Sequence, residues 1–321
     1  MSFVQRLLSI SVQLAPNTQT NQPNQFLESG TDVVILSGSR TSVKIENSGS
    51  AANSRATIKI WGMTPSLMNQ LSTLGLVVNL VPKNQITVQA GDDVSGMATV
   101  FTGTIWNSYG DYEAMPDVPF IFTCLQSGAD VVISAPPSSF RGAADVATMM
   151  SGFARQINMG FENNGVSSTL YNQYFSGSVR TQINKCAKAA NINVGVVNGN
   201  TLAIWPKGGN RNTSNVPVIS SQTGMVGYPA FTQQGIIVKT LFSPLIAVGG
   251  LFQIESSLLS GISAVQQQLQ SGGSPIPKSS LFPSQWAVNK LDLDLESLLP
   301  KGQWLSTIYG YNPGYPRPLI T

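Results

Sequence analysis

Apolar and polar residues alternate along most of the chain with a period of two, which is typical of half-buried β-strands. The first such run covers residues 8–14, where Leu, Ile, Val and Leu alternate with Ser, Ser and Gln. Ile58 and Ile60 likewise fall on one face of a run whose other face is mostly polar. The same alternation predicts further strands at 33–36, 42–46, 86–90, 99–106, 120–125 and 131–134. Many short strands at this spacing predict a first β-barrel over residues 1–135, with one short helix capped by Thr64.

The hydrophobic period changes to that of a helix within residues 136–210. Apolar side chains in 143–157 recur at i, i+3, i+4 and i+7, namely Val146, Met149, Met150 and Phe153. A second stripe of this spacing predicts a helix over 177–190. Two strand-like runs then flank Asn198-Gly199, a dipeptide that favours the tight turn of a β-hairpin. We therefore predict a small α+β module of two helices and a hairpin between the flanking β regions.

Residues 211–321 return to the strand pattern and are predicted to form a second β-barrel. The segment 255–285 interrupts this pattern, because apolar residues recur there at helical spacing before a Gly/Ser/Pro stretch. The apolar positions are Leu258, Ile262, Val265 and Leu269. We expect an inserted helix that docks on a partner instead of packing in the barrel core. The proline-rich stretch from Tyr311 to Pro318 is predicted to be an extended C-terminal arm.

The composition indicates that the protein assembles with copies of itself or with other proteins. Charged residues make up 10% of the chain, against roughly a quarter in typical soluble domains. Charged residues are depleted where a surface is covered by a neighbour, so the composition favours a self-assembling protein over a monomer. The net charge of +3 is scattered along the chain. It therefore indicates neither specific nucleic-acid binding nor attachment to a membrane surface.

Few residues offer catalytic chemistry. The chain has no histidine, which excludes Ser-His-Asp and Cys-His catalysis. The sequence also contains no P-loop, no G-x-S-x-G motif and no dinucleotide-binding fingerprint. Cys124 and Cys186 lie in apolar patterns and are predicted to be two buried free thiols, too few for a structural zinc site. We therefore expect no enzyme activity, no cofactor and no metal.

The most acidic stretch of the chain is 291–296, where carboxylates alternate with leucines. Asp292, Asp294 and Glu296 fall on one face of a predicted strand, and three leucines fall on the other. A pair of carboxylates could serve a glycosidase or bind a hard cation. Neighbouring positions on one strand face are about 7 Å apart and point in parallel, so they do not converge on a bond. A solvated strand face is the favoured interpretation.

Several local motifs follow one another in an order that resembles a known family. The turn Gly227-Tyr228-Pro229 is followed by Q-G-I-I-V at 234–238, L-F-S-P at 241–244 and G-G-L-F-Q-I at 249–254. This order is similar to the second barrel of baseplate hub proteins from tailed bacteriophages. The first region adds ATIKIWGM, PSLMNQL, ITVQAGDD and VFTGTIWNSY in the matching order, although Trp-Gly-Met and Gly-Asp-Asp replace the usual Asn-Leu and Gly-Tyr. Together these motifs cover about half of the chain.

The resemblance implies a mainly β fold with two tail-tube-like β-barrel domains, 1–135 and 211–321, around an α+β module, 136–210. It implies a homotrimer whose six barrels form a pseudo-sixfold ring joining the tail tube to the central spike. The expected partners are tail-tube, spike and other baseplate proteins, within a virion tail assembled in the host cytoplasm. DNA would pass through the ring without specific binding, and no membrane insertion is expected. Asp292, Asp294 and Glu296 would then face the DNA channel during ejection.

Two other functions fit the same residues. The chain could be a tail-tube subunit or another self-assembling β structural protein, although its length and its α+β module argue against a simple tube subunit. It could instead be a carbohydrate-binding or hydrolytic surface protein, which exposed Trp and Tyr side chains would favour. The absence of histidine and of a convergent acid pair argues against the hydrolytic version.

Overall fold

The computed structural model describes residues 5–16, 24–47, 54–73, 84–126, 135–197, 200–212, 215–232, 235–255, 285–299 and 301–313. Strands dominate the described residues, as the alternating pattern predicts. The N-terminal region contains β1 (Arg6–Gln13), β2 (Val33–Ser37), β3 (Thr41–Asn47), β4 (Arg55–Trp61), α1 (Pro65–Leu71), β5 (Gln85–Asp92), β6 (Gly96–Gly110), the 3-10 turn η1 (Tyr112–Ala114) and β7 (Pro119–Leu125).

The middle region combines two helices with five strands. These elements are β8 (Ser138–Asp145), α3 (Val146–Gln156), β9 (Gly160–Asn163), β10 (Thr169–Phe175), α4 (Val179–Ala189), β11 (Ile192–Val197) and β12 (Thr201–Pro206). The C-terminal region is again β: β13 (Val218–Ser220), β14 (Ala230–Thr232), β15 (Gly235–Leu241), β16 (Leu251–Glu255), β17 (Gln285–Ser297) and β18 (Trp304–Tyr311).

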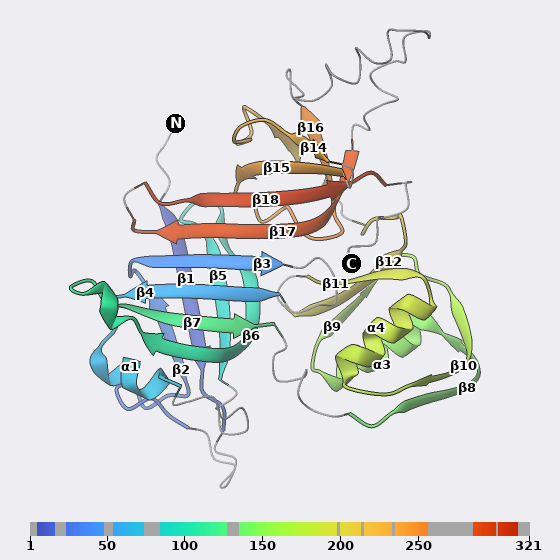
Figure 1. The fold of residues 1–321 in the computed structure, drawn as a ribbon, viewed down its shortest axis with the longest axis horizontal. Helices are drawn as coiled ribbons and strands as arrows, with labels where there is room; N and C mark the ends of the chain where they lie inside the picture. Colours follow the sequence, from blue (N-terminus) through green and yellow to red (C-terminus); the bar gives the residue numbers. More distant parts are fainter. Residues whose placement is uncertain are drawn as a thin grey trace.

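One 13-stranded sheet runs through both β regions in the order β14-β15-β18-β17-β3-β4-β7-β6-β5-β1-β2, and β16 pairs with both β13 and β17. The two regions meet where β17 pairs antiparallel with β3, from Leu291 opposite Asn47 to Ser297 opposite Thr41. In Figure 1, β15, β18, β17, β3, β4 and β7 form one front layer, and β1 and β5 cross behind it. The mainly β fold is thus confirmed.

The expected pair of closed barrels is not what the described strands form. Instead of closing onto its own region, β3 pairs with a strand of the other region, and the pairings of the described strands form no closed ring. The alternation of apolar residues predicts which face of a strand is buried. It does not say which strand lies beside it, and the barrel expectation went wrong at that step.

A single hydrophobic core lies behind the front layer. It takes Ile10 and Val88 from the crossing strands, Ile45 and Ile58 from the front layer, and Leu293 from the C-terminal region. On the opposite side of the layer, β3, β4 and β17 carry mostly polar and charged residues. The short helix α1 covers one end of this core, and the Thr64 hydroxyl accepts a hydrogen bond from the Leu67 N–H there. This confirms the predicted cap.

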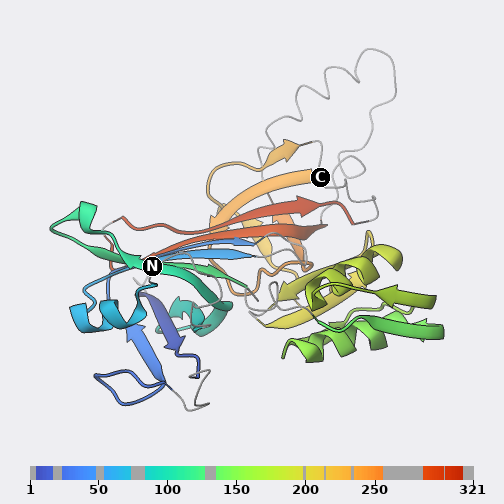
Figure 2. The ribbon, with the colours of Figure 1, turned by 60° about the horizontal axis from the view of Figure 1, so that its bottom comes forward.

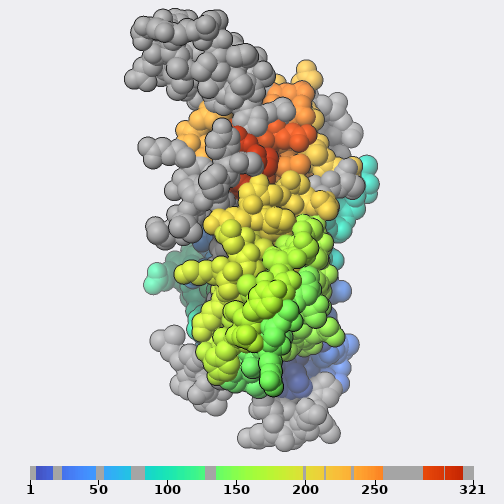
Figure 3. Space-filling view, turned by 90° about the vertical axis from the view of Figure 1, so that its right-hand side faces the viewer, coloured from blue at the N-terminus to red at the C-terminus, as the bar shows by residue number. Residues whose placement is uncertain are grey.

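The α+β module has a core of its own. The stripe predicted from helical spacing is buried, with Met150 fully inaccessible and Phe153 at 1% exposure. The predicted helices and hairpin are confirmed as α3, α4 and the pair β11–β12. Strands β8, β9 and β10 were not predicted. Figure 2 shows the module, coloured green to yellow, beside one end of the long strands, and Figure 3 shows that its surface covers much of this side of the molecule.

Candidate functional site

The front layer presents a largely polar surface, which we call the polar face. It is the side of β15, β18, β17, β3 and β4 that points away from the hydrophobic core. Four larger side chains interrupt it on β15 and β18: Ile237, Leu241, Leu305 and Tyr309. Asp292, Asp294 and Glu296 all lie on it, and the leucines that alternate with them are buried. The predicted alternation of this strand is therefore confirmed, and the three carboxylates share one side of one sheet.

Strand pairing brings cations beside these carboxylates. On β3, Lys44 lies opposite Asp294, and Glu46 lies opposite Asp292. On the next strand, Arg55 lies opposite Glu46. The charged side chains on this face are Lys44, Arg55, Lys59, Lys239 and Lys290, with Glu46, Asp292, Asp294 and Glu296. The face is thus one of mixed charge, not a band of negative charge alone.

Two ion pairs join neighbours on the same strand. The Lys290 Nζ lies 2.8 Å from the Asp292 Oδ2 and 5.0 Å from the centre of the Tyr309 ring. Burial disfavours the charged form of Lys290, but the hydrogen bond and charge of Asp292 outweigh it, so the pKa of Lys290 is raised. The Lys44 Nζ and Glu46 Oε1 are 3.7 Å apart, between side chains that are 62% and 54% exposed. Such an exposed pair contributes little to stability but places opposite charges side by side.

Asp294 occupies the middle of the face. Burial raises the pKa of its carboxyl, and the nearby charge of Glu296 raises it further, while Lys44 and Lys239 act in the opposite direction. The side chain borders a depression of about 310 Å³. The other residues that line the depression are Ser42, Lys44, Glu46, Arg55, Thr57 and Lys59. Cations from β3 and β4 therefore line the same depression as this carboxylate.

Glu296 has a structural partner. Its Oε2 accepts a hydrogen bond of 2.9 Å from the backbone N–H of Gln303, and its Oε1 accepts one of 3.4 Å from the Ser42 hydroxyl. The carboxylate therefore holds the connection between β17 and β18 as well as facing outward.

The arrangement offers no convergent catalytic pair, because the carboxylates leave one strand in parallel directions. Within the ranges that the structure describes, no group of three His, Cys, Asp or Glu side chains is placed to hold a metal ion. Cys124 and Cys186 are both buried and free, as predicted. None of the described helices is long and apolar enough to cross a bilayer. The docking residues Leu258, Ile262, Val265 and Leu269 lie outside the described residues, as do residues 314–318 of the predicted arm. The first residue of the predicted arm, Tyr311, is instead the last residue of β18 and pairs with Ala287.

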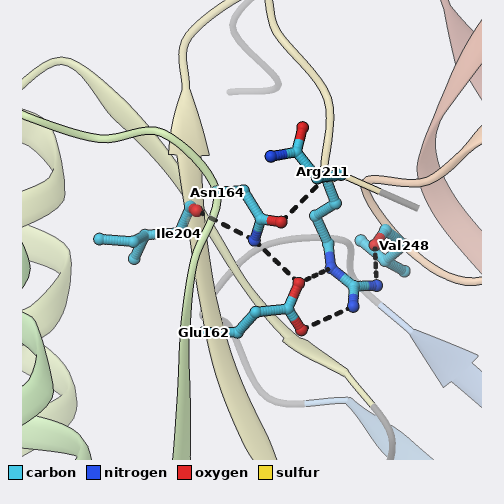
Figure 4. Close-up of polar contacts among 6 residues, drawn as sticks. Glu162, Asn164, Ile204, Arg211 and Val248 are labelled. Atoms are coloured by element: carbon cyan, nitrogen blue, oxygen red, sulfur yellow. Dashed lines mark hydrogen bonds and ion pairs between the residues drawn. The ribbon is translucent and has the colours of Figure 1, made fainter. Parts of the chain in front are cut away.

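A second polar cluster joins the α+β module to the sheet, and we call it the clamp. Figure 4 shows the Arg211 guanidinium facing the Glu162 carboxylate. The Nε–Oε1 and Nη2–Oε2 distances are 3.0 and 2.8 Å, and Nη1 donates to the Val248 carbonyl at 3.3 Å. Asn164 donates to Glu162 and accepts from the Asn212 N–H. The clamp therefore connects β9 with the turn before β16.

The two partners of the clamp differ in burial. The Arg211 side chain is 8% exposed, whereas that of Glu162 is 31% exposed. Hydrogen bonding to Arg211 lowers the pKa of Glu162 against the opposing effect of burial. Gly249 packs on the arginine stem with a φ of +79°, and an added Cβ would lie 2.9 Å from the Arg211 Cγ and Cδ. A side chain at position 249 would therefore push against the clamp.

Sequence reasoning did not find the clamp or the cations of the polar face. The two charged partners of the clamp stand 49 positions apart in the chain, so no local pattern links them. The cations beside Asp294 come from β3, β4 and β15, and only the strand order brings them together.

A family model described as Baseplate hub gp41 matches residues 25–263, well over half of the 321-residue chain. A search of curated protein sequences found no match. Among solved structures, the tail protein from Neisseria meningitidis MC58 is similar with a TM-score of 0.56 and 10% identity, over 96% of this chain and 97% of that one. The 43 kDa tail protein of prophage MuSo2 from Shewanella oneidensis gives 0.50 and 11%, over 95% and 98%.

A third similar structure comes from a secretion system. The c3393 protein of E. coli is a component of the type VI secretion system and exhibits structural similarity to the T4 bacteriophage tail proteins gp27 and gp5. It matches with a TM-score of 0.54 and 9% identity, over 88% of this chain and 77% of that one. At these identities the three structural matches show a shared fold.

Proposed function

Because the chain belongs to the baseplate hub gp41 family, we propose that it forms a trimeric ring that joins the tail tube to the central spike. Family membership makes it a structural protein of a phage tail and not an enzyme. The proposal adds the ring, its symmetry and its two attachment faces. On this account each subunit supplies one third of the wall of a channel for DNA.

The pairing of β17 with β3 carries this proposal. It fuses the two β regions into one layer with a hydrophobic core on one side and the polar face on the other. Such a layer suits a ring wall, because its largely polar side can face a water-filled channel while its apolar side packs in the core of the subunit. We propose that each β region is one of the two tube-like units of the subunit, with the α+β module outside the wall.

On this proposal Asp292, Asp294 and Glu296 face the channel together with the lysines beside them. A nearly balanced surface suits the passage of a polyanion, because net positive charge would retain phosphate by counterion release. The alternative is that the polar face lies on the outer surface of the ring. In an assembled tail, solutes in the surrounding solution would reach the polar face if it lay on the outer surface, but not if it lined the channel.

Light scattering tests the ring. We expect a mass near three subunits for the purified chain, or for the chain mixed with its spike protein if assembly requires that partner. A monomeric mass that persists when the spike protein is present would remove the proposal.

We also propose that the segment 255–285 docks on a tail partner through Leu258, Ile262, Val265 and Leu269. The proposal rests on their helical spacing in the sequence and on the position of the segment between β16 and β17. Replacing residues 256–284 with a short Gly/Ser linker is expected to leave the fold intact and to impair assembly. Loss of the folded state would show that the segment belongs to the core.

A further inference from the structure

Four of the five cations named for the polar face, all except Lys59, have a carboxylate beside them or opposite them in the same subunit. Lys290 is paired with Asp292 at 2.8 Å, and Lys44 with Glu46 at 3.7 Å. Asp294 lies opposite Lys44 and also interacts electrostatically with Lys239. Each of these carboxylates therefore has a cation beside it.

From this layout we infer that the polar face is a latent binding surface for double-stranded DNA, which Glu46, Asp292 and Asp294 keep masked. The inference rests on the proposed function, since the cations on a wall along which DNA passes must not hold the DNA. In this view the carboxylates act less by repelling phosphate at a distance than by neutralising the lysine and arginine side chains next to them.

The cations are placed to reach a polyanion once they are unmasked. Lys44, Arg55 and Lys59 border one shallow depression, and Lys44 is 62% exposed. Arg55 and Lys59 are also exposed, on the neighbouring strand. Removal of the three masking charges leaves Glu296 as the remaining carboxylate among the charged residues named for this face. Glu296 should be kept, because it holds the Gln303 backbone N–H.

Fluorescence anisotropy with a labelled 20-base-pair duplex tests the inference on the purified full chain. The variant is Glu46→Gln/Asp292→Asn/Asp294→Asn. The wild type is expected to bind weakly. We expect the variant to bind at least about tenfold more tightly at low salt, because released cations contact phosphates. Three new phosphate contacts would steepen the log–log salt dependence by about 2 to 3 units.

A matched control removes the same number of charges elsewhere. Asp93→Asn/Asp111→Asn/Glu113→Gln changes carboxylates in the β5–β6 turn and at η1, none of which belongs to the strands of the polar face. Its DNA affinity is expected to stay close to that of the wild type. Adding Lys44→Gln and Arg55→Gln to the unmasked variant should remove most of the gain in binding, which locates the effect on this face.

The DNA-binding measurements distinguish masking of the cations from an effect of net charge. No gain in the unmasked variant, or an equal gain in the control, would overturn the inference, because net charge and not masking would then decide binding. If the unmasked variant does not fold, the single change Glu46→Gln at an exposed side chain tests the same point with a smaller gain. Failure of the proposed function would show in the mass of the assembled ring, which the DNA measurement on isolated chains does not involve.

Discussion

Replacing Glu162 with methionine is expected to destabilise the fold more than replacing Arg211 with methionine, although both changes break the same ion pair. The asymmetry follows from burial. Without Glu162, the guanidinium of Arg211 stays 8% exposed and keeps only its 3.3 Å bond to the Val248 carbonyl. Without Arg211, the Glu162 carboxylate is 31% exposed and keeps a hydrogen bond from Asn164.

The magnitudes follow from the cost of an unpaired buried charge. Breaking a buried pair by removing one partner costs about 3–5 kcal/mol, and we expect Glu162→Met to fall in this range. Arg211→Met should cost about 1–3 kcal/mol, because the remaining carboxylate reaches water and methionine still fills much of the space of the arginine stem. The double variant should be less destabilised than Glu162→Met alone, since no charge is then left unpaired.

Urea unfolding of the four proteins measures these differences and their coupling energy. Hydrogen exchange adds a local readout: the opening of β9 and of the turn containing Val248 should become faster before the rest of the sheet responds. Equal losses for the two single variants, or a coupling energy near zero, would refute the reasoning from burial. A uniform rise in exchange over the whole chain would refute the local role of the clamp.

Three further predictions concern individual side chains. The pKa of Glu162 is lowered in the fold, so its contribution to stability is complete above the ordinary value of 4.5 and is lost as the pH falls through the lower folded value. The melting temperatures of the wild type and of the Glu162→Met/Arg211→Met variant should therefore converge as the pH is lowered. The pKa of Asp294 is raised, so Asp294→Asn is expected to keep or increase the melting temperature at pH 7 and to lose any gain under acid conditions; a clear loss at pH 7 would contradict this. Gly249→Ala should lower stability by at least about 1 kcal/mol in thermal melts, because the backbone has a positive φ and the new Cβ meets Arg211; unchanged stability would contradict the close packing.

The elements that the sequence predicts well are those whose pattern is local. Helix α3 is a case in point, because Met149, Met150 and Phe153 repeat at helical spacing and face one core. The hairpin β11–β12 follows from its turn dipeptide and its apolar strands. Strand β17 follows from the alternation of leucine with carboxylate. In each case the signal lies within about a dozen residues.

The elements that were missed depend on distant partners. Strands β8 and β10 form a two-stranded ribbon with a bulge, and their exposed positions include Tyr171 and Tyr174, which hides the period of two. Strand β18 carries Leu305 and Tyr309 on its polar side, so its alternation is weak as well. The open sheet and the mixed charge of the polar face both follow from the β3–β17 pairing, which joins residues that are far apart in the chain.

A cryo-electron microscopy reconstruction of the chain bound to its tail-tube and spike partners tests the central claim most directly. The account predicts a ring of three subunits in which β17 and β3 of each subunit form part of the inner wall. Asp292, Asp294 and the lysines beside them should then line the axial opening. A ring of another symmetry, or a polar face turned toward the outer surface, would contradict it.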